Sequence, residues 1–313
     1  MNAAQAIAEY IVHQRCLGKR FHWDDWLLTA FGNSVGSIPL CEIGPDMVRH
    51  FLDRKGTSEG TVRKKYGILD RFFRFAVARH LLKASPMPQN IRKLGPSSFA
   101  PYIYSNAELK QLLAAVPLAC GPHSKIDGHT LRTFLLLLYG AGLRRGEALH
   151  LKLSDVDEPQ SLIHVRGAKF FKSRIVPLDA SVNTVLQEYL TKRRKHNSRD
   201  LDSPLFCKRS GEPLTGSAIA RAFRRLRAIA GIRRDGGSRR QPRLHDLRHS
   251  AAVHRVTSWY RQGADLNDLL PKLATYLGHK DLSGTQRYLT MTPELLAEAS
   301  LRFEAFARRS DHD

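Results

Sequence analysis

Apolar positions in the first 95 residues recur at helical spacing. They fall three or four residues apart in 3–16 and 23–29, and Gly44-Pro45-Asp46 starts a further helix that ends at Gly56. A longer periodic segment follows, and its apolar stripe consists of Tyr66, Leu69, Phe72, Phe73, Phe75, Ala76 and Leu81. The pattern predicts an entirely helical region over residues 1–95.

The rest of the chain continues this helical pattern but changes its period once. One helix starts after Ser105, with Glu108 three residues on as the second half of a capping box. A buried apolar helix, 130–139, breaks at a Gly-Ala-Gly sequence. Residues 162–166 and 174–178 follow a period of two, which predicts short strands joined by a loop. The predicted fold class is mainly α with a small antiparallel β-hairpin or sheet.

Helical spacing returns after the strands. Helices are expected over 180–190, 217–230, 245–260, 266–277 and 284–289, with a basic loop at 192–195. A last helix begins at Pro293, and its apolar stripe consists of Leu295, Leu296, Ala299, Phe303 and Phe306. A helix so apolar and so close to the terminus either packs on its own domain or docks elsewhere.

The 313 residues are enough for two domains, each with its own core. Residues 85–101 are rich in Pro, Ser and Gly and show no periodicity, which indicates a linker. We expect a helical domain over 1–95, a linker over 96–102 and a second domain over 103–313. Such an arrangement could act as a hinged clamp.

The charge balance suggests the class of partner. Lys and Arg number 50 against 29 Asp and Glu, a formal net charge of +21. Such an excess favours a polyanion, and nucleic acid is the commonest one, although a merely basic surface is the alternative. The candidate DNA-binding residues are Arg63, Lys64, Lys65, Arg71, Lys172, Arg174, Arg221, Arg224, Arg225 and Arg243.

Several other classes are disfavoured. The four cysteines are scattered and form no C-x-x-C pair, so neither a disulfide framework nor a zinc–cysteine site is indicated, and a reducing cytosol fits. The first residues lack the pattern of a signal peptide. The most apolar run, 134–139, is too short to span a bilayer. The Walker pattern is absent, so ATP is not implied.

The candidate chemistry gathers in residues 244–288. His245 and Arg248 are three residues apart, so they share one side of a helix start. Cutting a DNA phosphodiester without metal or ATP needs two guanidiniums to neutralise the phosphate, a nucleophile, and a proton donor for the leaving oxygen. A zinc site at His245 and His249 is the alternative, but neither an H-E-x-x-H pattern nor a third ligand supports it.

Five motifs in order resemble the tyrosine recombinases, the phage-integrase or Xer-like family. They are Gly142-Leu143-Arg144 with Glu147, the hairpin from Lys169 to Pro177, His245-Asp246-Leu247-Arg248-His249, Leu277-Gly278-His279, and Tyr288 nine residues later. The resemblance implies a two-domain architecture, with a helical SAM-like core-binding domain before a mixed α/β catalytic domain. Gly284 departs from the family, which usually has Thr or Ser there, and could loosen the tyrosine segment.

The resemblance also implies residue roles. Arg144 and Arg248 would bind the scissile phosphate, and Glu147 would orient the site. Lys169 would be the general acid, although Lys172 lies in the same loop. The remaining roles are His245 as proton acceptor and donor, His279 as a hydrogen-bond donor to the phosphate, and Tyr288 as the nucleophile that forms a 3′-phosphotyrosyl link. The rival tyrosines, Tyr260 and Tyr276, lie off the family spacing.

The family further implies a site-specific recombinase or integrase that needs no metal and no nucleotide cofactor. Its partner would be double-stranded DNA carrying recombination sites. A homotetramer assembled through the C-terminal helix is expected, with accessory recombinases or DNA-bending proteins as possible helpers. Two alternatives stay open: a type IB topoisomerase-like or hairpin-forming resolvase activity, and a catalytically inactive DNA-binding regulator.

Overall fold

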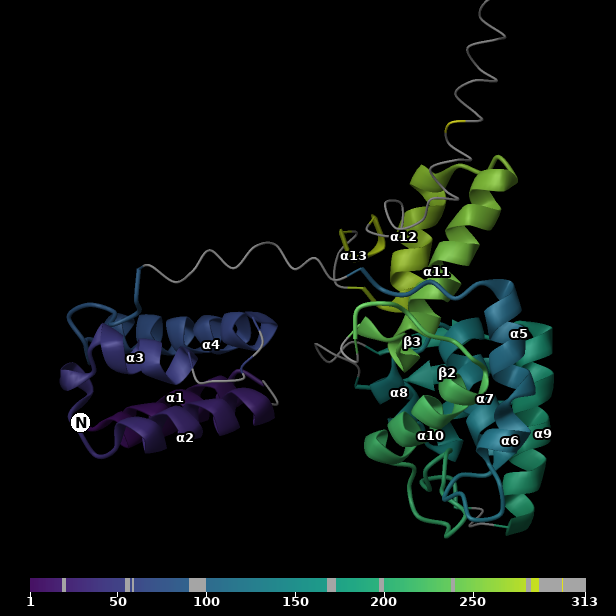
Figure 1. Ribbon diagram of the computed structural model, residues 1–313, viewed down its shortest axis with the longest axis horizontal. Coiled ribbons are helices and arrows are strands. Elements are labelled where there is room, and N and C mark those ends of the chain that lie inside the picture. Colours follow the sequence, from purple (N-terminus) through teal and green to yellow (C-terminus); the bar gives the residue numbers. More distant parts are fainter. Residues whose placement is uncertain are drawn as a thin grey trace, which may run out of the picture. The chain divides into compact units, whose positions relative to one another are not determined.

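The structure is a computed structural model that describes residues 1–18, 21–53, 57, 59–89, 100–167, 173–196, 200–237, 240–279, 283–286 and 300. The chain divides into two compact units, residues 1–99 and 100–313. Each is described by itself (Figure 1). Among the described residues, no helix is both long and apolar enough to cross a membrane.

The first unit is helical, as its periodicity predicts. Its elements are α1 (Ala3–Cys16), α2 (His22–Val35), a 3-10 turn (Leu40–Glu42), α3 (Pro45–Leu52) and α4 (Glu59–Ala78). The apolar stripe predicted for α4 is confirmed for Leu69, Phe72, Phe73 and Ala76, which are fully buried. Phe73 meets Phe31 of α2 edge to face, with ring centroids 5.9 Å apart. This core leaves the basic face of α4 on the outside.

The second unit combines helices with one small sheet. Its helices are α5 (Asn106–Ala114), α6 (Val116–Ala119), α7 (Gly128–Gly140), α8 (Arg145–His150), α9 (Ala180–His196), α10 (Gly216–Ile229), α11 (Leu244–Arg261), α12 (Leu266–Leu277) and α13 (Ser283–Gln286), with a 3-10 turn at Leu153–Asp155. The strands β1 (Val156–Asp157), β2 (Leu162–Val165) and β3 (Arg174–Pro177) form an antiparallel sheet in the order β1-β2-β3. The predicted fold class is confirmed.

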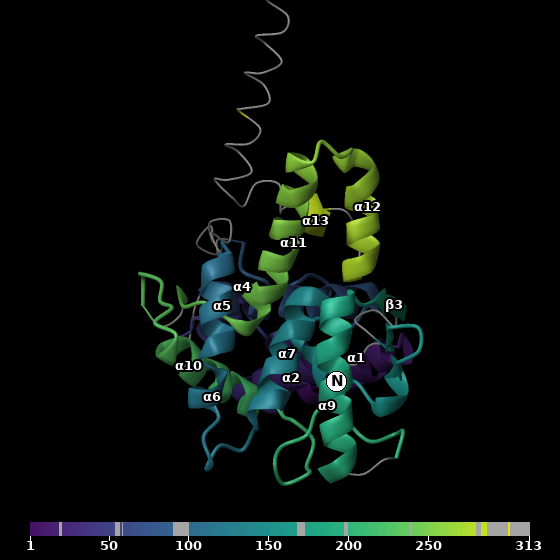
Figure 2. The ribbon, with the colours of Figure 1, turned by 90° about the vertical axis from the view of Figure 1, so that its right-hand side faces the viewer.

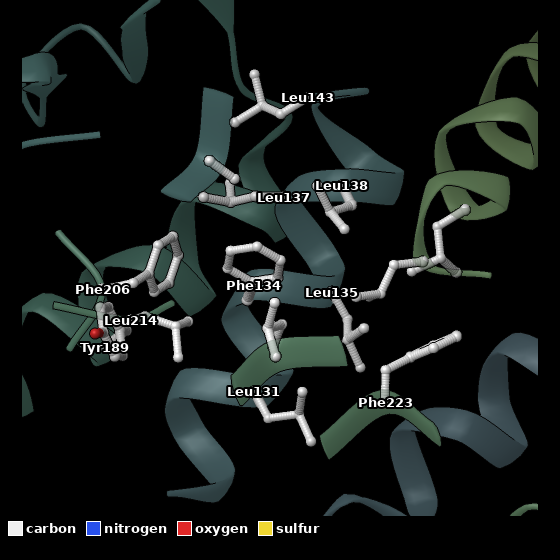
Figure 3. Packing of buried hydrophobic residues seen from close by; sticks show 14 of the residues in the cluster. Leu131, Phe134, Leu135, Leu137, Leu138, Leu143, Tyr189, Phe206, Leu214 and Phe223 are labelled. Atoms are coloured by element: carbon white, nitrogen blue, oxygen red, sulfur yellow. The ribbon is translucent and has the colours of Figure 1, made fainter. Parts of the chain in front are cut away.

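The core of the second unit forms around α7. This helix packs against α9 and α11 (Figure 2). Its buried side chains, among them Leu131, Phe134 and Leu138, meet residues from distant segments, and Phe134 contacts Phe206 with centroids 5.1 Å apart (Figure 3). Asp127 starts the helix by accepting a hydrogen bond from the Thr130 backbone N–H. The end of α7 is therefore a rigid base for the turn that leads into α8.

Two sequence expectations differ from the structure. The run 192–195 was expected to be a loop, but α9 continues through it to His196. Cations are favourable at a helix C-terminus, and Arg193 is buried there with its Nε donating to the Leu205 carbonyl at 2.9 Å. Strand β1 was not expected at all, because a two-residue strand has no measurable period.

Candidate active site

Arg248 is fixed by the start of α11. The helix begins with a capping box, in which the Arg243 backbone N–H donates to Asp246 Oδ2 at 2.8 Å. One turn later Arg248 is 1% exposed and points into the unit. Its Nη1 donates to the Gly142 carbonyl, and its Nη2 donates to the Leu277 carbonyl at 2.5 Å. This guanidinium therefore joins the end of α7 to the end of α12.

Arg144 follows the turn after α7. Gly142 has φ +60°, and a Cβ there would lie 2.7 Å from Leu277 Cδ2, so only glycine fits this close approach. Arg144 is the N-cap of α8, and its Nη1 donates to Glu147 Oε1 at 2.7 Å. Its Nη2 donates to the Gly278 carbonyl at 2.6 Å. The turn thus brings Arg144 to the same helix end as Arg248.

Glu147 lies between two arginines. Its Oε1 accepts from Arg144 and from Arg174 Nη1, the latter at 2.9 Å, and its Oε2 accepts from Arg174 Nη2 at 2.8 Å. Burial alone would raise the pKa of the carboxyl, but the hydrogen bonds from Arg174 and Arg144 outweigh burial and lower the pKa to about 2. Glu147 is therefore ionised at any working pH.

Arg174 was expected to contact DNA, but its side chain faces inward. It is only 10% exposed, and besides Glu147 it donates from Nε to the Tyr276 carbonyl at 2.9 Å. It begins β3, whose antiparallel pairing sets Arg174 opposite Val165. The hairpin therefore supplies a third arginine to the cluster.

The three arginines hold three consecutive carbonyls. Tyr276, Leu277 and Gly278 end α12, and their carbonyl oxygens accept from Arg174, Arg248 and Arg144 respectively. The last carbonyls of a helix have no partner within it and form the negative end of its dipole, so guanidiniums suit them. The C-terminal end of α12 is thus the centre of the cluster.

His279 comes directly after this helix end. Gly278 takes the left-handed conformation, φ +66° and ψ 45°, and turns the chain out of α12. The Nδ1 atom of His279 lies 2.7 Å from Oγ1 of Thr285, a fully buried residue of α13. Thr285 was not singled out in the sequence, although it stands three residues before Tyr288, where the family's Ser-x-Thr-x-x-Tyr run has Thr. The contact fixes the imidazole relative to the arginines.

His245 is held neutral near the same cluster. Burial, and after it the positive charge of Arg248, lower its pKa to about 4. The neighbouring His249 has its pKa lowered to about 4 as well, by burial and then by His245, and the two ring centroids are 4.8 Å apart. Within the described ranges, no third His, Cys, Asp or Glu groups with them as a metal-binding set. A neutral imidazole can accept a proton at neutral pH.

Three expected site residues, Lys169, Lys172 and Tyr288, lie outside the described residues. The rival Tyr276 is described, and its hydroxyl donates to the Pro177 carbonyl at 3.3 Å. The structure thus brings together Arg144, Glu147 and Arg248, with His279 at the end of the helix that both arginines hold.

The candidate DNA-binding residues differ in their surroundings. Those with exposed side chains are Arg63, Lys64, Arg71, Arg221, Arg224, Arg225 and Arg243. Arg71 also pairs with Asp24 at 3.3 Å. Lys65 instead lies over the Phe51 ring, 4.8 Å from its centroid, and Arg243 pairs with Asp246 at 2.9 Å.

Sequence comparisons identify the family. The phage integrase family model matches residues 104–294. The chain is 35% identical over 304 residues to an integrase/recombinase of Sinorhizobium fredii, which covers 96% of both chains. It is 31% identical over 276 residues to the tyrosine recombinase XerC of Halalkalibacterium halodurans, which covers 84% of this chain and 82% of that relative.

Solved structures share the fold. A XerH site-specific recombinase bound to a palindromic difH substrate matches with a TM-score of 0.66 and 23% identity, over 90% of this chain and 78% of that one. A Tn1549 transposon integrase in complex with transposon right end DNA matches with a TM-score of 0.70 and 19% identity, over 98% and 100%. The chain belongs to the phage integrase family and is a tyrosine-type site-specific recombinase.

Proposed function

We propose that the chain cuts and rejoins DNA at specific sites through a 3′-phosphotyrosyl intermediate formed by Tyr288. The Tyr288 oxygen attacks the scissile phosphorus, the bond to the 5′-oxygen breaks, and that oxygen leaves as a hydroxyl protonated by Lys169. In rejoining, a 5′-hydroxyl attacks the phosphotyrosine and releases Tyr288. Each step exchanges one phosphodiester for another, so no nucleotide is needed to restore the bond.

The observation that carries this proposal is the meeting of Arg144 and Arg248 at one helix end, directly before His279. Two fixed guanidiniums neutralise the charge that builds on the phosphate oxygens in the transition state. His279, held by Thr285, would donate a hydrogen bond to the same phosphate. His245, with a pKa of about 4, is unprotonated at neutral pH and can take the Tyr288 proton.

The partner of this site is double-stranded DNA. The net charge of +21 and the exposed arginines of α10 suit a phosphate backbone. We propose that four copies assemble on two duplexes through the C-terminal helix, and that accessory recombinases or DNA-bending proteins can assist. Of the expected final helix, only residue 300 is among the described residues.

Covalent capture tests the mechanism. Duplexes enriched from the host genome by binding to the purified chain would be nicked near the candidate cleavage position, so that the short cleaved product diffuses away and the adduct accumulates. Wild type should form a covalent complex that survives denaturation, and Tyr288→Phe should form none while still binding the DNA. A complex that persists in Tyr288→Phe, or no complex with wild type on any enriched duplex, would contradict the proposal.

The same duplexes separate the alternatives. A topoisomerase-like enzyme would relax supercoiled DNA that carries one site, whereas a recombinase needs two sites to exchange strands. An inactive regulator would bind the duplexes and leave no adduct with any variant.

A further inference from the structure

We propose that Arg174 is a positioning residue of the active site: it orients Arg144 through Glu147 and holds the helix end that carries His279, without itself binding the phosphate. This inference rests on the proposed function. Three separate contacts of Arg174 support it.

The first contact is a two-pronged ion pair. Arg174 Nη1 and Nη2 donate to the two oxygens of Glu147 at 2.9 and 2.8 Å, and the side chains are 10% and 6% exposed. Glu147 uses the same two oxygens for the Nη1 and the backbone N–H of Arg144, at 2.7 and 2.9 Å. A carboxylate that receives four donors has one orientation. Arg174 therefore fixes the surface against which the Arg144 guanidinium lies.

The second contact is with the end of α12. Arg174 Nε donates to the Tyr276 carbonyl at 2.9 Å, two residues before the Gly278 carbonyl that Arg144 holds. This bond joins the hairpin to the helix from which His279 leaves. A shift of Arg174 would move both the arginine and the histidine of the site.

The third contact is the packing of the Arg174 side chain against the turn at Gly278. A Cβ at Gly278 would lie 2.9 Å from Arg174 Nη1 and 3.2 Å from its Cδ, so the guanidinium and the turn fit closely. Arg174 thus packs against the residue that directly precedes His279. The position of the turn depends on the side chain packed against it.

The charges also favour a second arginine beside Glu147. Glu147 is ionised, with a pKa of about 2, and alone with Arg144 it would leave a pair of zero net charge beside the phosphate. Arg174 supplies a second positive charge to the same carboxylate, so the group of three keeps a net positive charge for an anionic substrate. Lysine cannot replace it, because a single ammonium cannot make two parallel bonds to Glu147 and reach the Tyr276 carbonyl as well.

The test separates DNA binding from chemistry. Arg174→Lys and Arg174→Met would be compared with wild type on the nicked duplex, by the Kd for DNA and by the single-turnover rate of covalent complex formation at saturating DNA. We expect the Kd and its salt dependence to change by less than about threefold and the rate to fall about 10- to 100-fold in both variants, as misplacement of catalytic groups does. If Arg174 contacted a phosphate directly, its replacement by Met would instead raise the Kd for DNA and reduce the salt slope by about one.

Two further variants sharpen the outcome. Glu147→Gln combined with Arg174→Met should lose less rate than the sum of the two single variants predicts, because the two residues share the ion pair. Arg166→Met is the matched control: Arg166 follows β2, pairs with Asp155 at 2.9 Å and is 67% exposed, so its rate should match wild type. Thermal unfolding of each variant identifies any loss of folding. If Arg174→Met is unstable, Arg174→Lys, which keeps the positive charge, still tests the proposal.

The results distinguish the two proposals. If wild type forms no Tyr288-dependent complex, the proposed function fails. If wild type forms it and folded Arg174→Lys forms it equally fast, only the positioning role is overturned. A variant whose rate loss disappears at higher DNA concentration would also overturn the positioning role and would assign Arg174 to DNA binding.

Discussion

At the scale of single residues, Gly278 links the arginine cluster to the end of α12. It ends α12 at φ +66°, gives its carbonyl to Arg144 and leaves no room for a Cβ beside Arg174. A side chain there would meet both backbone strain and a steric clash. The strain alone costs about 1 kcal/mol.

We expect Gly278→Ala to lower the free energy of unfolding by at least this amount and to slow covalent complex formation more than about tenfold. Gly231→Ala is the control, because Gly231 has φ +70° and nothing within 4 Å of a Cβ. It should lose similar stability and keep the cleavage rate. Equal rate losses in both variants would show that the cleavage rate responds to strain alone.

The two buried histidines predict a pH dependence of stability. His245 and His249 each have a pKa lowered to about 4 in the folded chain, mainly by burial. Between pH 6.5 and 4 the unfolded chain binds protons that the folded chain does not, so stability falls as pH decreases across this range. The loss is on the order of 1–3 kcal/mol.

Urea unfolding at a series of pH values measures this loss. The double variant His245→Gln and His249→Gln should show a flatter dependence than wild type over the same range. The same substitution at exposed His123 controls for the removal of a histidine. A double variant that loses stability as steeply as wild type would contradict the prediction.

At this scale the sequence predicted which residues lie close together better than it predicted their surroundings. Motif order placed Arg144, Glu147 and Arg248 in one site, and the structure brings them together. It did not reveal that Arg174 faces inward, because the neighbouring Ile175 and Val176 are both apolar and leave the face of the strand undecided. Ile175 is 55% exposed and Val176 fully buried, so the strand register decides the matter, and register is a tertiary property.

Among the elements, α4 and α10 present exposed cations opposite buried apolar faces. Arg63 and Lys64 lie on α4, whose other side includes the buried Phe72 and Phe73. Such a face can lie along a phosphate backbone without disturbing the core.

Removing two of these charges should change the salt dependence of DNA binding. For Arg63→Ala with Lys64→Ala, we expect the slope of log K against log salt concentration to fall by about 0.9 for each phosphate that the variant no longer neutralises. Lys110→Ala with Lys272→Ala removes the same charge from α5 and α12 and should leave the slope unchanged. Fluorescence anisotropy at several salt concentrations measures the slope for each variant. A slope for Arg63→Ala with Lys64→Ala equal to that of wild type would show that these residues of α4 do not contact the DNA.

Element boundaries show where pattern reasoning works. The prediction of 266–277 matches α12, because its apolar period is strong and Gly278 ends it. The capping box of Ser105 and Glu108 is confirmed at the start of α5. The predicted end of α9 was wrong because polar residues carry no apolar period, and Arg193 in its last turns bonds to Pro204 and Leu205 in the segment that follows the helix.

At the scale of the whole molecule, the chain forms two units with separate cores. Apolar clusters form within residues 3–76 and within 104–277. The boundaries expected from the sequence, 95 and 103, enclose the division between the units at residue 99. The Pro-, Ser- and Gly-rich composition of residues 85–101 is what indicates this division in the sequence.

Assembly provides a prediction at this scale. Phe303 and Phe306 of the expected last helix lie outside the described residues, and we propose that they dock on a neighbouring copy. Phe303→Ala with Phe306→Ala should keep covalent complex formation on a single site and lose synapsis of two sites, as measured by native gel electrophoresis. Intact synapsis in this variant would contradict docking through these side chains.

The carbonyls at the end of α12 have a consequence for inhibition. Arg144 and Arg248, the proposed phosphate ligands, already donate to Gly278 and Leu277, so a small anion can use only part of the five N–H donors of each guanidinium. Each hydrogen bond it gains has a net value of only about 1 kcal/mol. Free phosphate and sulfate would therefore be weak competitors, whereas a duplex binds through many phosphates at once.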